Sequence, residues 1–222
     1  MKFKAIIFDM DGTIIDTGDT WNLATQKLIE HHDANYSIQM HNEINKYVIG
    51  AGLFEACKVI KEIAQIKADV QELMIRKKII VSELLNKNLT FITGFSDFHK
   101  ELAGKNLKSA LATNADDNTL DIVKKILKLE DFFGEHLYNV SHVEKPKPHP
   151  DLYLHAAEKL KEKASECIAV EDSAIGIAAA KAAGMLCIGI NTGNDLAALK
   201  QADFVINKYQ DINLNKIISL IK

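Results

Sequence analysis

Short apolar runs alternate along this chain with longer segments in which apolar residues recur every three or four positions. The short runs end in acids, polar residues or glycine, which is typical of strands buried on both faces of a parallel sheet. The longer segments have the spacing of amphipathic helices. Strands are predicted at 4–8, 107–112, 167–170, 185–190 and, more weakly, 203–206, and helices at 117–129, 151–162, 174–183 and 214–221. This alternation predicts an α/β fold with a doubly wound, Rossmann-like parallel sheet.

One long stretch, residues 17–92, breaks the alternation. Its apolar spacing predicts consecutive helices at 20–32, 43–48, 53–66 and 70–85. A helical block between the first two strands is expected to be an inserted all-α module. We therefore predict an α/β core of residues 1–16 and 93–222 and a helical cap of residues 17–92. Gly18 and Gly94 lie near the two junctions, where they would allow flexing or serve a turn.

Composition limits the classes of partner. The chain has 222 residues, of which 47% are hydrophobic and 26% charged, and a formal net charge of −3. That charge gives no electrostatic reason to expect nucleic acid or an anionic membrane as a partner. No segment approaches the ~20 apolar residues of a membrane span, and no signal-like region is present, so a cytoplasmic location is expected. Three widely spaced cysteines are expected to be reduced, buried thiols.

Pairs of acids follow two of the predicted strands. Asp9 and Asp11 follow the first, and Glu171 and Asp172 follow the strand at 167–170. Each pair has a simpler interpretation, an Asx turn for the first and a helix cap for the second. If both strands are central, however, the four carboxylates converge, and two such charges ~4 Å apart repel by ~4 kcal/mol at an effective dielectric of about 20. Protons or a cation would be needed, and oxygen ligands favour Mg²⁺.

Two further segments offer groups that bind phosphate. Thr113 and Asn114 close the strand at 107–112, where a hydroxyl, an amide and backbone N–H groups before a helix could hold phosphoryl oxygens, although such a pair is more often a cap. Lys147 lies in the segment 145–151, which contains all three prolines of the chain. Such a loop is stiff, so it could aim a lysine at the carboxylates, or it could simply connect two elements.

Taken together and in this order, these motifs resemble the haloacid dehalogenase-like hydrolase superfamily. The first motif is matched by residues 9–13, the second by Thr113, the third by Lys147 and the fourth by residues 171–176. The run 178–185 resembles the branch that includes phosphoglycolate phosphatase and beta-phosphoglucomutase, and that branch carries a helical cap between the first and second motifs.

The resemblance implies a mechanism. Asp9 would attack phosphorus and form an aspartyl phosphate, and Asp11 would protonate the leaving oxygen and then activate water. Asp9, the Asp11 main-chain carbonyl and Asp172 would hold Mg²⁺, with Glu171 bound directly or through water. The phosphate would be held by Thr113, Asn114 and Lys147. An acid at position 11 favours phosphate esters over dehalogenation, because a halide leaves without a proton.

Three functions remain open: a phosphatase for a small phosphorylated metabolite (a sugar phosphate, phosphoglycolate or a nucleotide), a sugar phosphomutase, and a phosphate-binding protein without catalysis. The phosphatase is favoured, because two residues of beta-phosphoglucomutases are missing here. Those mutases carry a histidine where this chain has Trp21, and a cap-loop arginine roughly where this chain has Gly-Ala-Gly at residues 50–52. Residues 76–78 would form a solvated helix face or reach the substrate, and Trp21 and Phe54 would pack in the cap or line its pocket. A monomer or a dimer is expected.

Overall fold

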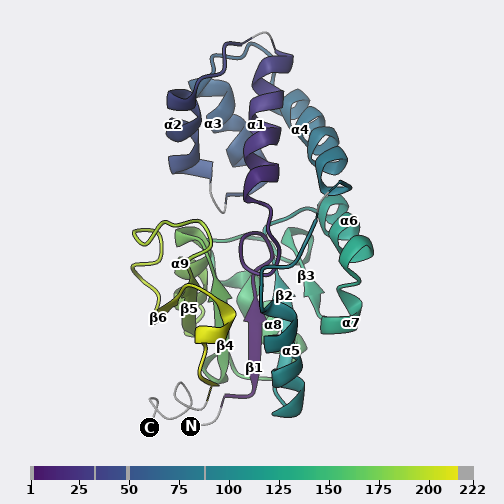
Figure 1. Cartoon of the computed structure of the whole chain (residues 1–222), viewed down its shortest axis with the longest axis vertical. Helices are drawn as coiled ribbons and strands as arrows, with labels where there is room; N and C mark the ends of the chain where they lie inside the picture. The colour runs from purple at the N-terminus through teal and green to yellow at the C-terminus, as the bar shows by residue number, and fades with distance from the viewer. Residues whose placement is uncertain (1–2, 33, 49–50, 88, 215–222) are drawn as a thin grey trace.

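The protein, described by a computed structural model over residues 3–32, 34–48, 51–87 and 89–214, is built from strands that alternate with helices (Figure 1). No helix in this part of the chain is long and apolar enough to cross a membrane. The strands are β1 (Ala5–Phe8), β2 (Lys108–Ala112), β3 (Leu137–Tyr138), β4 (Cys167–Glu171), β5 (Leu186–Ile190) and β6 (Phe204–Ile206). The α-helices are α1 (Gly18–His31), α2 (Ile38–Val48), α3 (Leu53–Ile63), α4 (Val70–Leu85), α5 (Phe95–Gly104), α6 (Asp117–Leu127), α7 (Glu130–Phe133), α8 (Asp151–Lys159) and α9 (Ala174–Ala182), and the 3-10 turns are η1 (Val140–His142), η2 (Ala164–Glu166) and η3 (Tyr209–Asp211).

The strands form one parallel sheet in the order β3-β2-β1-β4-β5-β6. Strand β1 is central, and its last residue, Phe8, pairs with Leu111 of β2 on one side and Val170 of β4 on the other. The chain therefore continues to one side of β1 and later returns on the other. Ligands of open α/β sheets bind at the carboxyl ends of the strands at such a point. The predicted motifs follow these three strands.

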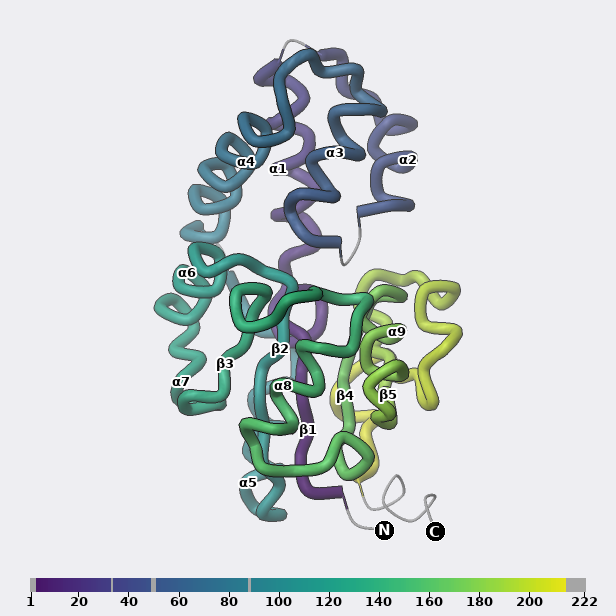
Figure 2. Tube along the Cα trace, turned by 180° about the vertical axis from the view of Figure 1, so that it is seen from behind, coloured from purple at the N-terminus to yellow at the C-terminus, as the bar shows by residue number. Residues whose placement is uncertain are grey.

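Helices cover both faces of the sheet, because alternate residues of each strand point to opposite sides. Ile6 and Phe8 belong to an apolar cluster shared with residues of α5, α6 and α7, whereas Ala5 and Ile7 belong to a second cluster with residues of α8 and α9. Figure 2 shows α8 and α9 in front of the sheet, on the face opposite α5. The predicted doubly wound α/β class is confirmed.

The four helices α1 to α4 form a separate layer beyond the carboxyl ends of the strands (Figure 1). The two segments that lead into and out of this layer pair with each other. Asp16 N–H donates to the Thr90 carbonyl at 3.0 Å, and Ile92 N–H donates to the Ile14 carbonyl at 2.9 Å. The helical cap is thus joined to the core by two connecting segments that are hydrogen-bonded to each other. The boundaries at 16/17 and 92/93 stay a prediction.

Several predicted elements differ from the observed ones. The sequence analysis missed β3, which has two residues and therefore no period, and α5, which follows the cap directly. The predicted helix 117–129 is split into α6 and α7, because Lys128 adopts a left-handed φ of 51°. The predicted helix 53–66 ends at Ile63, before Gln65 with a φ of 55°. The predicted helix 214–221 lies outside the described residues except for Leu214.

Gly94 serves a turn. Its φ is 89°, a left-handed value that L side chains rarely adopt, and it caps the N-terminus of α5. A Cβ at this position would also lie 2.4 Å from the amide of Gln210. Gly18, the other junction glycine, is the first residue of α1, and no atom would lie within 4 Å of a Cβ added to it.

Gly176 in α9 allows a helix to approach a buried carboxylate, and this generates a stability prediction. A Cβ at Gly176 would lie 1.9 Å from Oε1 of Glu171. We expect Gly176→Ala to lower the free energy of unfolding by about 1–3 kcal/mol, because overpacking outweighs the better helix propensity of alanine. Gly104→Ala in α5 is the matched control, since nothing lies within 4 Å of its added Cβ. Urea unfolding of both variants measures this; equal stability of the two would contradict the expected overpacking.

Candidate active site

The loop after β1 is fixed from several sides. Asp9 follows β1 directly, and its N–H donates to the Val170 carbonyl of β4 at 3.0 Å. Gly12 turns the chain with a φ of 74°, and its carbonyl accepts from the Thr192 hydroxyl at 2.6 Å. The buried Tyr209 hydroxyl donates to the Thr13 carbonyl at 2.9 Å. These bonds hold the backbone that carries Asp9 and Asp11 at the rim of the sheet.

Lys147 lies between two carboxylates from different strands. Its Nζ is 2.7 Å from Asp9 Oδ1 and 2.6 Å from Glu171 Oε1. It also lies 4.8 Å from the centre of the Tyr153 ring, a cation–π arrangement. Burial by itself lowers the pKa of Lys147, but Asp9 and Glu171 outweigh it and hold the pKa above its usual value. Lys147 is therefore a buried, charged ammonium, and the stiff loop aims it at the carboxylates.

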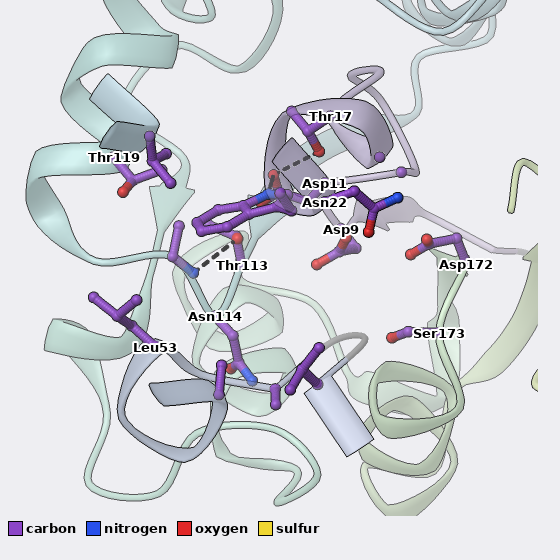
Figure 3. Close-up of a pocket in the computed structure, with 18 of the residues that line it drawn as sticks. Asp9, Asp11, Thr17, Asn22, Leu53, Thr113, Asn114, Thr119, Asp172 and Ser173 are labelled. Atoms are coloured by element: carbon purple, nitrogen blue, oxygen red, sulfur yellow. Dashed lines mark hydrogen bonds between the residues drawn. The ribbon is translucent and has the colours of Figure 1, made fainter. Parts of the chain in front are cut away.

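The side chain of Asn114 holds the backbone of Lys147. Its Nδ2 donates to the Lys147 carbonyl at 3.1 Å, and its Oδ1 accepts from the Lys147 N–H at 3.0 Å. This side chain therefore fixes the lysine loop, and the predicted role of Asn114 in holding a phosphate stays a prediction. Thr113 is buried at the same strand end, and its hydroxyl oxygen accepts from the Ala115 N–H at 3.0 Å (Figure 3).

Glu171 is fully buried as the last residue of β4. Besides Lys147, its Oε1 accepts from the Tyr153 hydroxyl at 2.7 Å, and its Oε2 accepts from the Ser173 hydroxyl at 3.2 Å. Ser173 is also the N-cap of α9, so the cap of this helix and the orientation of Glu171 are linked. The sequence analysis did not find Tyr153, because a tyrosine on the apolar face of a helix is indistinguishable from a core residue.

Three carboxylates could hold a metal ion. Ligand oxygens of Asp9, Glu171 and Asp172 all lie within 4.8 Å of one another. Asp172 packs on Gly12, where a Cβ would lie 2.1 Å from its Oδ2, and it accepts from the Thr13 hydroxyl at 3.3 Å. Figure 3 shows Asp9 and Asp172 on two sides of one cavity. An all-oxygen donor set of this kind suits a hard divalent cation.

The charge balance of this cluster also favours a cation. Burial raises the pKa of Asp9 to about 7, with Glu171 and Asp11 adding to the effect and Lys147 opposing it. Burial, followed by the charges of Asp9 and Glu171, raises the pKa of Asp172 well above its ordinary value. One lysine therefore does not neutralise the cluster. The residues present fit a metal ion.

The side chain of Asp11 lies apart from the three carboxylates and contacts the cap. Its Oδ1 accepts from the Thr17 hydroxyl at 2.8 Å and from the Trp21 indole N–H at 2.7 Å. Burial raises the pKa of Asp11, and these two donors oppose that shift. Trp21 follows Thr17 by one helical turn, since its backbone N–H donates to the Thr17 carbonyl at 3.0 Å. The first turn of α1 thus holds the predicted acid.

A cavity of about 360 Å³ lies above this site, between the cap and the core. It is lined by Asp9, Asp11, Thr113, Lys147 and Asp172 from the core and by Trp21, Asn22, Asn45, Leu53 and Lys77, among others, from the cap. Its mixed polar and apolar wall has room for a small organic group beyond a phosphate. In Figure 3, Asn22 points toward the side of the cavity where Asp9 and Asp172 lie.

Lys77 is not part of a solvated helix face, which was one of the two roles expected for residues 76–78. It is 2% exposed, and its Nζ donates to the Thr25 hydroxyl at 3.1 Å and lies 5.7 Å from the centre of the Trp21 ring. Burial lowers its pKa to about 8. Lys78 makes an ion pair of 2.7 Å with Asp116, from α4 to the residue before α6. Phe54 is 47% exposed and does not line the cavity.

Comparison with known proteins agrees with this geometry. Residues 6–190 match the family model described as haloacid dehalogenase-like hydrolase. The chain belongs to this family.

Two relatives of known sequence cover nearly the whole chain. A protein of Bacillus subtilis named beta-phosphoglucomutase is 30% identical over 220 residues, which are 95% of this chain and 92% of the relative. A protein of Thermotoga maritima named phosphorylated carbohydrates phosphatase is 30% identical over 208 residues, 91% of this chain and 92% of the relative.

A solved structure from Entamoeba histolytica, a hydrolase of the same family, shares the fold with a TM-score of 0.87 and 22% identity. It aligns over 98% of this chain and 99% of its own. The haloacid dehalogenase-like fold expected from the motifs is therefore confirmed.

The raised pKa of Asp9 predicts how stability depends on pH. Between about pH 4 and pH 7 the folded protein keeps a proton on Asp9 that the unfolded chain has lost, so metal-free wild type loses stability as the pH rises through this window. The loss should appear as a pH-dependent difference in the free energy of unfolding between wild type and Asp9→Asn, which cannot ionise there. Mg²⁺ should stabilise wild type more at pH 7.5 than at pH 5, because protons compete with it. A wild type to Asp9→Asn difference that stays constant across the window would contradict this.

Proposed function

We propose that the protein is a magnesium-dependent phosphatase that hydrolyses a small phosphorylated carbohydrate through an aspartyl phosphate on Asp9. The observation that carries the proposal is the position of the Lys147 ammonium, 2.7 Å from Asp9 and 2.6 Å from Glu171, beneath a cavity lined by both cap and core. A cation there lowers the repulsion between an anionic nucleophile and an anionic phosphate.

Each residue has a defined part in the proposed reaction. The Asp9 carboxylate attacks phosphorus, and the ester oxygen departs with its electron pair and a proton from Asp11. Asp11 then takes a proton from the water that attacks the aspartyl phosphate, which frees Asp9 and releases inorganic phosphate. Lys147 and the Thr113 hydroxyl hold phosphate oxygens while charge moves onto them. Asn114 contributes through its hold on the Lys147 backbone.

Mg²⁺ fits the site as a resident ion. Asp9, Asp172 and the main-chain carbonyl of Asp11 would hold it, with Glu171 bound directly or through a water molecule. When bound, it neutralises charge on the carboxylates and the phosphate. The family membership and the oxygen donor set support a divalent ion, and the choice of Mg²⁺ rests on the preference of hard cations for carboxylates and water.

The substrate class comes from the cavity and from the relatives. Three relatives at 28–30% identity are named beta-phosphoglucomutase, phosphorylated carbohydrates phosphatase and fructose-1-phosphate phosphatase. A cavity of about 360 Å³, lined on its cap side by Asn22, Asn45 and Lys77, has donors suited to the hydroxyl groups of a sugar. We propose that the cap binds the sugar portion and the core binds the phosphate.

A phosphomutase is the second candidate, and the 30% identity to a protein named beta-phosphoglucomutase favours it. Against it stands position 21, where those mutases are expected to carry a histidine. Here this position is a tryptophan, and its indole is engaged with Asp11. Isomerised sugar phosphate formed without free phosphate would identify a mutase.

The test is phosphate release from a panel of sugar phosphates, phosphoglycolate and nucleoside monophosphates. We expect the wild type to release phosphate with Mg²⁺, to stop when EDTA removes the metal, and to resume when Mg²⁺ is restored. Asp9→Asn should reduce the rate to background, because an amide cannot form the phosphoenzyme. Glu62→Gln, on the cap helix α3 and outside the cavity lining, is the control for an acid-to-amide change. Wild type and Asp9→Asn acting alike on every substrate would overturn the proposal.

A further inference from the structure

Trp21 connects the cap to Asp11 of the core. It is a residue of the cap, in α1, yet its indole N–H donates to the core residue Asp11 at 2.7 Å. Trp21 is the one tryptophan of the chain and also lines the cavity. The bond therefore crosses from the cap to the residue proposed as the acid and base.

The same oxygen of Asp11 receives both donors. Thr17 donates its hydroxyl hydrogen to Oδ1 at 2.8 Å, and Trp21 donates to Oδ1 as well. An indole nitrogen can donate but cannot accept, so Oδ1 must be the acceptor in this pair. A proton on Oδ1 would compete with these two donors, so the geometry favours Oδ2 as the oxygen that carries a proton on Asp11.

Trp21 is itself held from the cap side. Its carbonyl accepts from the Thr25 hydroxyl at 3.0 Å, and the same hydroxyl accepts from Lys77 Nζ at 3.1 Å. The Lys77 ammonium lies 5.7 Å from the centre of the indole ring. Thr25 of α1 therefore holds the backbone of Trp21, and Lys77 of α4 lies over the ring whose N–H contacts Asp11.

We propose that Trp21 is a positioning residue that selects Oδ2 of Asp11 as the oxygen that delivers the proton to the leaving group. This inference rests on the proposed function. As the Asp9 carboxylate forms its bond to phosphorus, the bond from phosphorus to the ester oxygen breaks, and its electron pair stays on that oxygen. The oxygen takes the proton from Oδ2. Asp11 becomes a carboxylate, with Thr17 and Trp21 still donating to Oδ1.

The test compares two kinds of phosphate ester in Trp21→Phe, which keeps an aromatic ring and removes the N–H. An alkyl ester such as a hexose phosphate needs a proton on its leaving oxygen, whereas the nitrophenolate of p-nitrophenyl phosphate leaves without one. We expect kcat/KM to fall about 10- to 100-fold for the alkyl ester, which is part of the effect of a general acid, and less than about threefold for the aryl ester. The ratio kcat/KM covers only the steps up to phosphoenzyme formation, so the later water attack does not enter.

Tyr47→Phe is the matched control, because it also removes one polar hydrogen from a cap aromatic, which is 57% exposed and outside the cavity lining. Its kcat/KM should match the wild type on both esters. An equal loss on the two esters in Trp21→Phe, or no loss on either, would overturn the inference while leaving the phosphatase in place. A wild type that hydrolyses neither ester would instead overturn the proposed function, and the inference with it.

A measurement without turnover separates positioning from general packing. A protein with one tryptophan gives one indole N–H peak in a ¹H–¹⁵N spectrum, and a hydrogen bond to a carboxylate moves that proton downfield. Asp11→Ala should move the peak upfield, whereas Asp19→Ala, at an exposed position of α1, should leave it in place. An unchanged peak in Asp11→Ala would contradict the contact on which the inference depends.

Discussion

The site depends on one buried ammonium held between carboxylates from neighbouring strands. Lys147 contacts Asp9 at the end of β1 and Glu171 at the end of β4, and all three side chains are nearly or fully removed from solvent. Burying a charge costs several kcal/mol unless partners compensate it. The compensation requires β1 and β4 to be adjacent and in register, the loop at 145–151 to be stiff, and Asn114 to hold the Lys147 backbone. The buried Lys147 contact is therefore possible only when all of these features of the core are in place.

Acidic groups outnumber the one lysine in this cluster. Asp172 lies against Gly12. Burial raises the pKa of both Asp9 and Asp172; the charge of Glu171 adds to both shifts, and the charge of Asp9 adds to that of Asp172. Such a site suits a divalent cation, and an anionic phosphate can approach the carboxylates once a bound cation offsets their charge. The crowded acids lower the stability of the fold locally, at the site where the reaction is proposed to occur. The closely packed sheet beneath the site holds these side chains in place.

The sequence predicted the sheet, the inserted helices and the positions of the core motifs, because these follow from local patterns. Acids and Thr113 directly after apolar runs must lie at the carboxyl edge once the strands are parallel. Contacts set by tertiary packing were not predictable. Nothing local distinguishes Tyr153 from a core residue, shows that Asn114 binds the Lys147 backbone, or reveals that Lys77 is buried while Lys78 pairs with Asp116. Strand β3 was missed because two residues carry no periodicity.

The most direct test of the proposed chemistry is to find the phosphoryl group on Asp9. The wild type would be mixed with a hydrolysed sugar phosphate and Mg²⁺, quenched in acid within one turnover, digested, and analysed by mass spectrometry. Residues 5–27 form one tryptic peptide that contains Asp9. The proposed mechanism predicts that this peptide carries one phosphoryl group in wild type and none in Asp9→Asn. Turnover by wild type with the label on another peptide, or retained in Asp9→Asn, would contradict it.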